Sequence, residues 1–493
     1  MPASKLIHHL RNYASAGVLS AVVGLVSFPL MTRSLSVADY GIVGLITSSV
    51  TLFIAIGKLG VQHAVIRFFA QIKNANIAFS SEELYSTVSA VFLALAAGAT
   101  VLFLLAGFQL LPEFLQYEDI SSLFLLAAPI VFVRILGSGV MNFLRAEQRS
   151  AEVAIAQSLA RFSNLLFIIA VLLLGVLDPH SVIVCLFFAE FMGVCFVVYQ
   201  YRNQFYFKRV DVSGKLSKAM LMYGMPLMIL ESLSLVLRLS DRYLIEAMLG
   251  VDELGQYSAS YNLTSYLDLI VLAAMLQAIR PAYMQIWESK GPEETKRFLT
   301  RIFHLYVVVG IPFIAMFAVT TPYILSFLAG PKYALGTVII PFVALSFWLE
   351  GAMNLLAAGL YIFKNTKVLM YTSLCATVLN LGLNFLLIPR FGISGAAAVT
   401  VFCYTVFLAV VTLFAFKHVS FKVEFKKPLL ISIASLGVFM FLKQLDFATD
   451  VHNFFYKGIG GTVVLSAAIW LLVPDVRPWV TKVPLPWRTG RKA

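Results

Sequence analysis

Long, unbroken apolar segments constrain this chain more than any other feature of its sequence. A helix needs about 20 mostly apolar residues to cross a bilayer, and the 493 residues contain about fourteen such segments, separated by short polar links. Only 13% of the residues are charged, against about 25% in soluble domains. Backbone groups in lipid must be hydrogen-bonded within the segment, which favours helices, and continuous apolar runs are not typical of a β-barrel. The sequence predicts an all-α integral membrane protein with about fourteen transmembrane helices.

The charges of the links predict the topology. The predicted spans are 12–32, 41–61, 84–108, 121–142, 153–176, 181–200, 219–248, 256–280, 301–320, 337–361, 367–388, 394–416, 428–443 and 456–473. With the N-terminus inside, the cytoplasmic links carry 26 of the 37 Lys and Arg residues and the outer links carry 5. This bias agrees with the positive-inside rule and predicts that both termini are cytoplasmic.

The two halves of the chain share a pattern. Aligning Gly41 with Gly255 gives an offset of 214 residues, which places the first span on the seventh and the fifth on the eleventh. Each half has six spans, so the copies share an orientation, and we expect two six-helix lobes in a parallel repeat around a central cleft. The predicted domains are an N-terminal lobe at 1–200, an inter-lobe link at 201–218, a C-terminal lobe at 219–416, and two C-terminal helices with a cytoplasmic tail at 417–493.

Several local patterns resemble the polysaccharide transporters, the Wzx-type O-antigen and exopolysaccharide flippases. They belong to the multidrug/oligosaccharidyl-lipid/polysaccharide flippase superfamily. The resemblance covers residues 1 to about 416 and rests on the segments 36–41, 241–245, 254–258, 330–334, 384–389 and 392–397. At span ends, the glycines and prolines of these segments are expected to serve turns and close helix packing rather than substrate.

The resemblance implies a function as well as a fold. It implies a V-shaped pair of lobes, a polar lumen, and alternating access that moves an undecaprenyl-pyrophosphate-linked oligosaccharide to the outer leaflet of the bacterial cytoplasmic (inner) membrane. The product would be a surface polysaccharide such as O-antigen, capsule or exopolysaccharide. The implied partners are the lipid-linked oligosaccharide and membrane lipids, with a polysaccharide polymerase and glycosyltransferases as candidate protein partners.

Ionisable residues within the spans are the candidates for function. Each costs at least about 2.5–3.5 kcal/mol at the bilayer centre, so each should face a wet cavity or a partner. Lys58, Glu246 and Arg280 lie near span ends, where they can snorkel to the interface. The others are Arg134, Arg161, Glu190, Glu231, Arg238, Asp241, Arg242, Asp268 and Glu350.

The span at 219–248 holds the densest cluster. Glu231, Arg238 and Arg242 are spaced by 7 and 4 residues, which puts them on one helical stripe, with Asp241 to one side. A polar stripe near mid-membrane is typical of a lumen lining. The alternative is a self-neutralised cluster in which Glu231 and Asp241 hold the arginines.

Arg134 and Arg161 are each about nine residues from the predicted cytoplasmic end of their spans, so they should share a depth of roughly 13 Å. Two guanidinium groups at one level could clamp a diphosphate through bidentate bonds. The alternative is pairing with Glu190 or with backbone carbonyls. Together with Arg238 and Arg242, these residues are the predicted substrate-binding set.

The intramembrane charges of the two lobes differ in sign. The first lobe holds Lys58, Arg134 and Arg161 against Glu190, and the second holds three arginines against five acids. The first lobe therefore suits an anion, and the second could bind H⁺ or Na⁺. The candidate coupling residues are Glu231, Asp268, Glu350 and Glu190.

Other function classes find little support in the sequence. Gly-rich phosphate loops, His/Cys metal spacing and nucleophile elbows are not found, so neither an enzyme nor a metal site nor a cofactor beyond a coupling ion is expected. The four cysteines lie in apolar runs and predict no disulfide, and no basic soluble domain suggests nucleic acid. A cation-coupled multidrug exporter of the same superfamily is the nearest alternative. A polyprenyl-sugar-dependent transferase is a more distant one, because the first outer link holds a single acid, Asp39.

Overall fold

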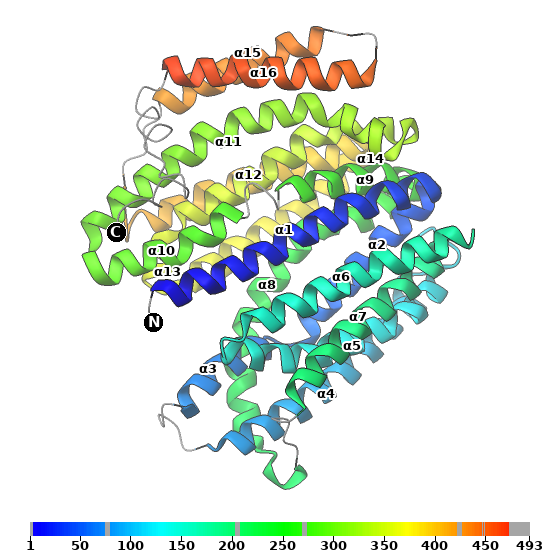
Figure 1. Ribbon diagram of the computed structural model, residues 1–493, viewed down its shortest axis with the longest axis vertical. Coiled ribbons are helices and arrows are strands. Elements are labelled where there is room, and N and C mark those ends of the chain that lie inside the picture. The colour runs from blue at the N-terminus through cyan, green and yellow to red at the C-terminus, as the bar shows by residue number, and fades with distance from the viewer. Residues whose placement is uncertain are drawn as a thin grey trace, which may run out of the picture.

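The computed structural model describes residues 3–73, 79–202, 208–268, 274–421, 426–445, 447 and 449–472, and these residues are helical without a strand (Figure 1). The α-helices are α1 (Ala3–Ser34), α2 (Val37–Gly57), α3 (Val61–Lys73), α4 (Ser81–Leu105), α5 (Ile120–Ala146), α6 (Ser150–Leu173), α7 (Pro179–Tyr201), α8 (Gly214–Leu249), α9 (Val251–Asp268), α10 (Ala274–Lys290), α11 (Pro292–Ala329), α12 (Ile340–Leu356), α13 (Ala358–Ile362), α14 (Thr366–Ala415), α15 (Lys426–Gln444) and α16 (Asp450–Leu472). Shorter helical turns are η1 (Ala106–Leu110), η2 (Arg209–Asp211) and η4 (Pro331–Ile339). The all-α prediction is confirmed.

Several helices begin at capping residues placed between the apolar runs. Ser80 and Glu83 form a capping box at the start of α4, and Asp178 and Ser181 form one at the start of α7. Ser213 caps α8 by accepting a hydrogen bond from a backbone amide of its first turn. Such caps satisfy amides that a helix leaves unpaired, so each link ends where the next apolar run begins.

Ten helical segments of the described residues are long and apolar enough to cross a membrane, and one of them is the whole of α14. At Gly392, which has a φ of +60°, α14 reverses direction. Asn384 and Thr400, eight residues either side of Gly392, bond the same carboxylate on α8, so the two halves of α14 lie side by side. α14 therefore supplies two predicted spans, 367–388 and 394–416.

The links predicted to share a side of the membrane also lie together. Arg33 donates to the carbonyl oxygen of Leu328, and Gln116 donates to the carbonyl oxygen of Ala247, which brings together four links assigned to the outer side. At the other end, Phe363 stacks on His418, so two cytoplasmic links meet there. This arrangement agrees with the predicted alternation, and the ends are called the predicted outer and predicted cytoplasmic ends below.

The packing of α1–α7, the first lobe, is repeated in α8–α14, the second lobe. α1 packs on α6 as α8 packs on α14, and α5 packs on α7 as α12 packs on α14. The two sets occupy opposite sides of Figure 1, with α2 and α8 running between them. α15 and α16 form a further layer against α11.

The repeat axis passes between the two glycines that the sequence alignment pairs. A Cβ atom on Gly41 would meet the backbone of Gly255 and the carbonyl oxygen of Val251, and one on Gly255 would meet the carbonyl oxygen of Val37. Val37 and Val251 are themselves related by the offset of 214. Only glycine allows backbones to approach this closely. The parallel repeat is therefore confirmed, and these glycines have the structural role expected of them.

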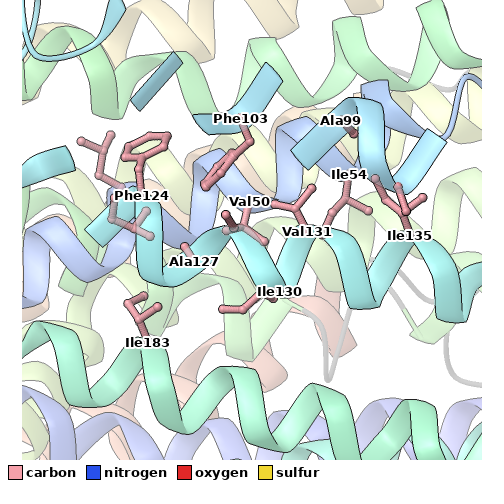
Figure 2. Packing of buried hydrophobic residues seen from close by; sticks show 14 of the residues in the cluster. Val50, Ile54, Ala99, Phe103, Phe124, Ala127, Ile130, Val131, Ile135 and Ile183 are labelled. Carbon is pink, nitrogen blue, oxygen red and sulfur yellow. The ribbon is translucent and has the colours of Figure 1, made fainter. Parts of the chain in front are cut away.

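Apolar side chains from α2, α4, α5, α7 and neighbouring helices fill the core of the first lobe (Figure 2). Val50 and Ile54 of α2 interlock with Phe103 of α4, and Val131 and Ile135 of α5 lie beside them, all nearly inaccessible to solvent. Between lipid-facing helices such packing, rather than exclusion of water, drives association. The first lobe is thus a tightly packed body.

Helix α8 connects the two lobes diagonally. Its N-terminal part packs on α3 and α4, with Leu216 and Met220 buried in the core of the first lobe. Pro226 interrupts its hydrogen bonding, and its C-terminal part packs on α14 and α2. One helix therefore touches both lobes at different heights.

Candidate functional site

The predicted charged stripe of α8 lies at the junction of the lobes, but each ionisable side chain has a different environment. Glu231 is partly exposed, Arg238 borders a small cavity, and Asp241, Arg242 and Glu246 are buried. In this structure the stripe is therefore not one continuous accessible surface.

Arg238 pairs with Glu350 of α12, within the second lobe, and its side chain is 39% exposed. Glu231 and Asp241, the partners expected from the sequence, are not its ion-pair partners in this structure. A cavity of about 10 Å³, roughly the space of one water molecule, is lined by Arg238, Tyr257 and Thr400. The cavity lies beside the residues that hold Asp241.

Asp241 occupies a closed pocket of oxygen-bearing side chains. Its carboxylate accepts hydrogen bonds from Tyr257 Oη at 2.9 Å, Thr400 Oγ1 at 2.9 Å and Asn384 Nδ2 at 2.6 Å. Asn380 Oδ1 lies next to them, and Asn384 Oδ1 is buried without a hydrogen-bond partner. A buried charge is normally paired or bound to a cation, so these oxygens fit a proton or a small hard cation at Asp241.

Arg242 holds the lobes together near the repeat axis. Its guanidinium donates to the carbonyl oxygen of Gly44 at 3.1 Å and to Ser48 Oγ at 2.6 Å, both on α2, and to Asn262 Oδ1 of α9. The side chain is buried over the ring of Tyr261. In this conformation Arg242 is therefore a contact between lobes and is closed to a substrate.

Glu231 joins α8 to α3 at the predicted cytoplasmic end. Its Oε2 accepts from Gln62 Nε2 at 3.0 Å and lies 3.4 Å from His63 Nε2. Lys58 lies within electrostatic range of Glu231, Arg134 and Arg145. Lys58 therefore belongs to a charged region between the lobes.

Glu246, like Glu231, bonds the first lobe, but at the predicted outer end. Its Oε1 accepts from the backbone amides of Gln116 at 2.7 Å and Tyr117 at 3.0 Å, in the link before α5 of the first lobe. The residue is fully buried. The expectation that it snorkels does not describe this structure, because its carboxylate bonds the opposite lobe.

The predicted diphosphate clamp is only half available. Arg134 Nη2 pairs with Glu190 Oε1 at 2.7 Å, with the two side chains 27% and 16% exposed, which is the alternative that the sequence left open. Arg161 is exposed, has no ion pair among the described residues, and lies within electrostatic range of Tyr266 on α9. Arg161 thus lies near α9 of the second lobe, and its exposed guanidinium can receive an anion.

The remaining sequence candidates are placed as follows. Arg280 donates to Asn354 Oδ1 at 3.0 Å and lies over the ring of Tyr361. The side chain of Asp268 lies outside the described residues. Among the described residues, no group of three or more His, Cys, Asp and Glu could hold a metal ion.

Sequence reasoning missed the residues that surround Asp241. Asn380 and Asn384, four residues apart in an apolar run, were a usable signal, because amides within a span need partners. Nothing in the sequence indicated that Thr400 and Tyr257 would meet them, since that depends on the reversal at Gly392 and on the packing of α9.

Comparisons with known proteins agree with this architecture. Residues 12–287 match the family model described as polysaccharide biosynthesis protein, and residues 226–386 match the model described as MatE. An uncharacterized membrane protein of Methanocaldococcus jannaschii is 29% identical over 254 residues, covering 48% of this chain and 48% of that protein. The chain therefore matches about half the length of that curated relative.

Two kinds of solved structure share the fold. The lipid II flippase MurJ, in an inward closed conformation, matches with a TM-score of 0.77 at 15% identity, covering 94% of this chain and 99% of that chain. An inward-facing multidrug resistance MATE family transporter of the MOP superfamily matches with a TM-score of 0.65 at 14% identity, covering 82% and 94%. At such identities these matches establish a shared fold.

Proposed function

The chain belongs to the polysaccharide biosynthesis protein family, with the two-lobed fold of MOP-superfamily transporters, and from that premise we propose that it is a flippase for lipid-linked oligosaccharides. It would carry an undecaprenyl-pyrophosphate-linked oligosaccharide from the inner to the outer leaflet of the bacterial cytoplasmic membrane by alternating access. The product would serve assembly of O-antigen, capsule or exopolysaccharide. A polymerase and glycosyltransferases would be its protein partners.

One observation carries the proposal: the first lobe has an exposed arginine within electrostatic range of α9 of the second lobe. Arg161 has no acidic partner among the described residues, and its side chain is accessible. A guanidinium binds phosphate oxygens through two parallel hydrogen bonds. Arg134 would join it once the substrate replaces Glu190 as the partner of its guanidinium. The headgroup would then sit between two arginines.

We further propose that the second lobe couples this movement to an ion. Asp241 is a buried carboxylate that accepts hydrogen bonds from the hydroxyls of Tyr257 and Thr400 and from Asn384 Nδ2, and the amide oxygen of Asn384 has no hydrogen-bond partner. H⁺ or Na⁺ would be held by Asp241, Asn380, Asn384 and Thr400. The water-sized cavity beside Arg238 links this pocket to the Arg238–Glu350 pair. Among the expected coupling residues whose side chains are described, Glu350 reaches this cavity through its pair with Arg238.

The membrane potential adds a driving force to this cycle. A potential of 100 mV is worth about 2.3 kcal/mol per charge that crosses the full membrane. A pyrophosphate with about two negative charges is therefore favoured outward by at most about twice that amount, if no cation travels with it. Binding of the ion at Asp241 would then reset the empty carrier.

The test is transport by the purified protein in proteoliposomes that contain a fluorescent undecaprenyl-pyrophosphate-linked oligosaccharide. A membrane-impermeant quencher reports how much of the label reaches the far leaflet. We expect flux with the parent protein and little with Arg161→Ala. A parent protein that moves no lipid-linked sugar in either orientation would refute the proposal.

A multidrug exporter is the second candidate, and the match of residues 226–386 to MatE favours it. Accumulation of cationic dyes in a deletion strain, measured with and without expression of the protein from a plasmid, distinguishes the exporter from the flippase. Dye export that is unaffected by Arg161→Ala, without any glycan export, would favour the exporter.

The proposed orientation places both termini in the cytoplasm. Reporter fusions at Glu113 and Glu253 should be external, and fusions at Arg209 and Lys426 should be cytoplasmic. A cytoplasmic signal at Glu253 would invert the second lobe and remove the basis of the transport proposal.

A further inference from the structure

An apolar cavity in the first lobe lies apart from the charged junction. It has a volume of about 390 Å³ between α4, α5 and α7. Its walls include Phe92 and Leu93 of α4, Val140 of α5, and Val194 and Val198 of α7. Leu93 and Val198 are 50% and 47% exposed, so the cavity opens on the lipid-facing surface of the bundle.

Aromatic side chains close the cavity at its predicted cytoplasmic end. Phe143 stacks on Tyr201 with ring centroids 5.8 Å apart, and Tyr85 lies 4.7 Å from Phe143. Tyr201 Oη donates to Glu147 Oε1 at 2.8 Å. Tyrosines with an apolar ring and a bonded hydroxyl are typical of the membrane–water interface, so this end of the cavity lies at headgroup level.

Three basic residues surround that end. Arg202 follows Tyr201 directly, is exposed, and stacks 3.8 Å from the ring of Tyr199. The backbone amide of Lys208 donates to Ser86 Oγ, which is next to Tyr85 of the cavity wall, and both Lys208 and Arg209 are exposed. The cavity thus combines an apolar interior with a rim at the interface that carries three exposed basic residues beside the carboxylate of Glu147.

We propose that this cavity binds an anionic phospholipid of the cytoplasmic leaflet, with one acyl chain between α4, α5 and α7 and the headgroup at Arg202, Lys208 and Arg209. The lining residues span positions 85–93 of α4, which at 1.5 Å per residue is about 12 Å of depth, enough for over half of an acyl chain. Basic sites between transmembrane helices on the cytoplasmic side recognise anionic headgroups. The proposal depends on the predicted orientation, and this site is separate from the proposed binding site of the transported lipid.

Photo-crosslinking tests the site. The full chain is reconstituted in phosphatidylcholine nanodiscs that contain either phosphatidylglycerol or phosphatidylcholine with a diazirine on one acyl chain, and adducts are mapped by mass spectrometry. We expect adducts on α4, α5 and α7 near Leu93, Val140 and Val198, with phosphatidylglycerol favoured about tenfold or more. Equal labelling by the two lipids would overturn the proposal.

Two sets of variants separate the binding of the acyl chain from the binding of the headgroup. Val198→Trp fills the cavity and should abolish the adducts on α4 and α5, whereas Val184→Trp, on the exposed surface of α7 outside the cavity, should not.

Charge reversal at Arg202, Lys208 and Arg209 should remove the preference for phosphatidylglycerol, by roughly fivefold per residue. Charge reversal at the exposed Lys215 and Lys218 should leave it intact. Labelling unchanged by Val198→Trp would overturn the site. Displacement of the probe by undecaprenyl phosphate but not by unlabelled phosphatidylglycerol would show that the occupant is a polyprenyl chain, and would overturn the assignment to phospholipid.

Discussion

The two lobes share one packing pattern but differ in how they hold charge. In the first lobe, Arg161 is exposed and has no acidic partner among the described residues, whereas Arg134 is partly buried and paired with Glu190. In the second lobe the key acid, Asp241, is buried and held by neutral oxygen and amide groups. The difference teaches that a repeated scaffold can keep its helix contacts while its two copies place charged side chains in different environments.

Helix α8 relates the two charge patterns. It holds Glu231, at its midpoint, against α3 and Glu246, near its C-terminus, against the link before α5, with Arg242 bonded to α2 between them. Any separation of the lobes must break one of these contacts. A substrate or ion can shift a carrier only by binding its states unequally. Helix α8 carries Asp241 of the proposed ion site and contacts the lobe that holds the proposed anion site.

Removing the accessible cation should have the largest effect. Arg161→Ala should lower transport by roughly 10- to 100-fold, because hydrogen bonds between charged groups are worth about 1.5–3 kcal/mol. Arg161→Lys should recover part of the activity. The measurement is initial flux in proteoliposomes, with protein insertion checked in parallel. Full activity of the Arg134→Ala, Arg161→Ala double variant would remove the anion site from the first lobe.

The repeat axis offers a test of what the lobes share. Gly41→Ala and Gly255→Ala each place a methyl group against the backbone of the facing helix, and each should destabilise the protein by about 1–3 kcal/mol. Because the contacts are related by the repeat, the two losses should be similar. Thermal unfolding in detergent measures them, with Gly98→Ala, where a methyl group meets open space, as the control. A loss at only one of the two glycines would mean that the axis is less symmetric than the packing indicates.

Asp241→Asn should separate ion coupling from substrate binding. The variant keeps the shape of the pocket but removes the negative charge that a bound cation requires. A tenfold Na⁺ or H⁺ gradient is worth about 1.4 kcal/mol per ion, so the stimulation of flux by the effective ion should fall from at most tenfold to none. Substrate affinity should change less than about twofold. Stimulation that persists in Asp241→Asn while Glu350→Gln loses it would relocate the coupling site.

Two intramembrane ion pairs, Arg134–Glu190 and Arg238–Glu350, allow a comparison of the two lobes in which the expected effects are smallest. Double-mutant cycles for Arg134–Glu190 and Arg238–Glu350 should each give coupling energies of about 1 kcal/mol in thermal unfolding. Substrate should weaken the first coupling, because it competes for Arg134, and leave the second unchanged. A substrate effect on Arg238–Glu350 alone would place the anion in the second lobe.

Sequence reasoning reached the fold because membrane insertion leaves strong one-dimensional signals. Span length, link charge and the Gly41–Gly255 offset each depend on local residues or on a simple repeat. The site depends on long-range pairing. Glu350 is 112 residues from Arg238, and Asn384 and Thr400 reach Asp241 only because the chain reverses at Gly392.

The role of Glu246 was hidden for a related reason. Its depth near a span end indicates an interfacial side chain, and the sequence contains no sign that backbone amides at Gln116 and Tyr117 would come to it. A backbone amide is present at almost every residue, so the sequence does not indicate which amides will bond a buried carboxylate.

The most direct test of the central claim is flux of undecaprenyl-pyrophosphate-linked oligosaccharide through the purified protein under three imposed forces, applied one at a time: a membrane potential, a H⁺ gradient and a Na⁺ gradient. We predict that an outside-positive potential drives the headgroup outward and that one of the two ion gradients increases the flux. Arg161→Ala should strongly lower the flux under every condition, and Asp241→Asn should remove only the ion effect. Flux that does not change with any of the three forces or with either substitution would contradict the proposal that the first lobe binds the anion and the second lobe binds the cation.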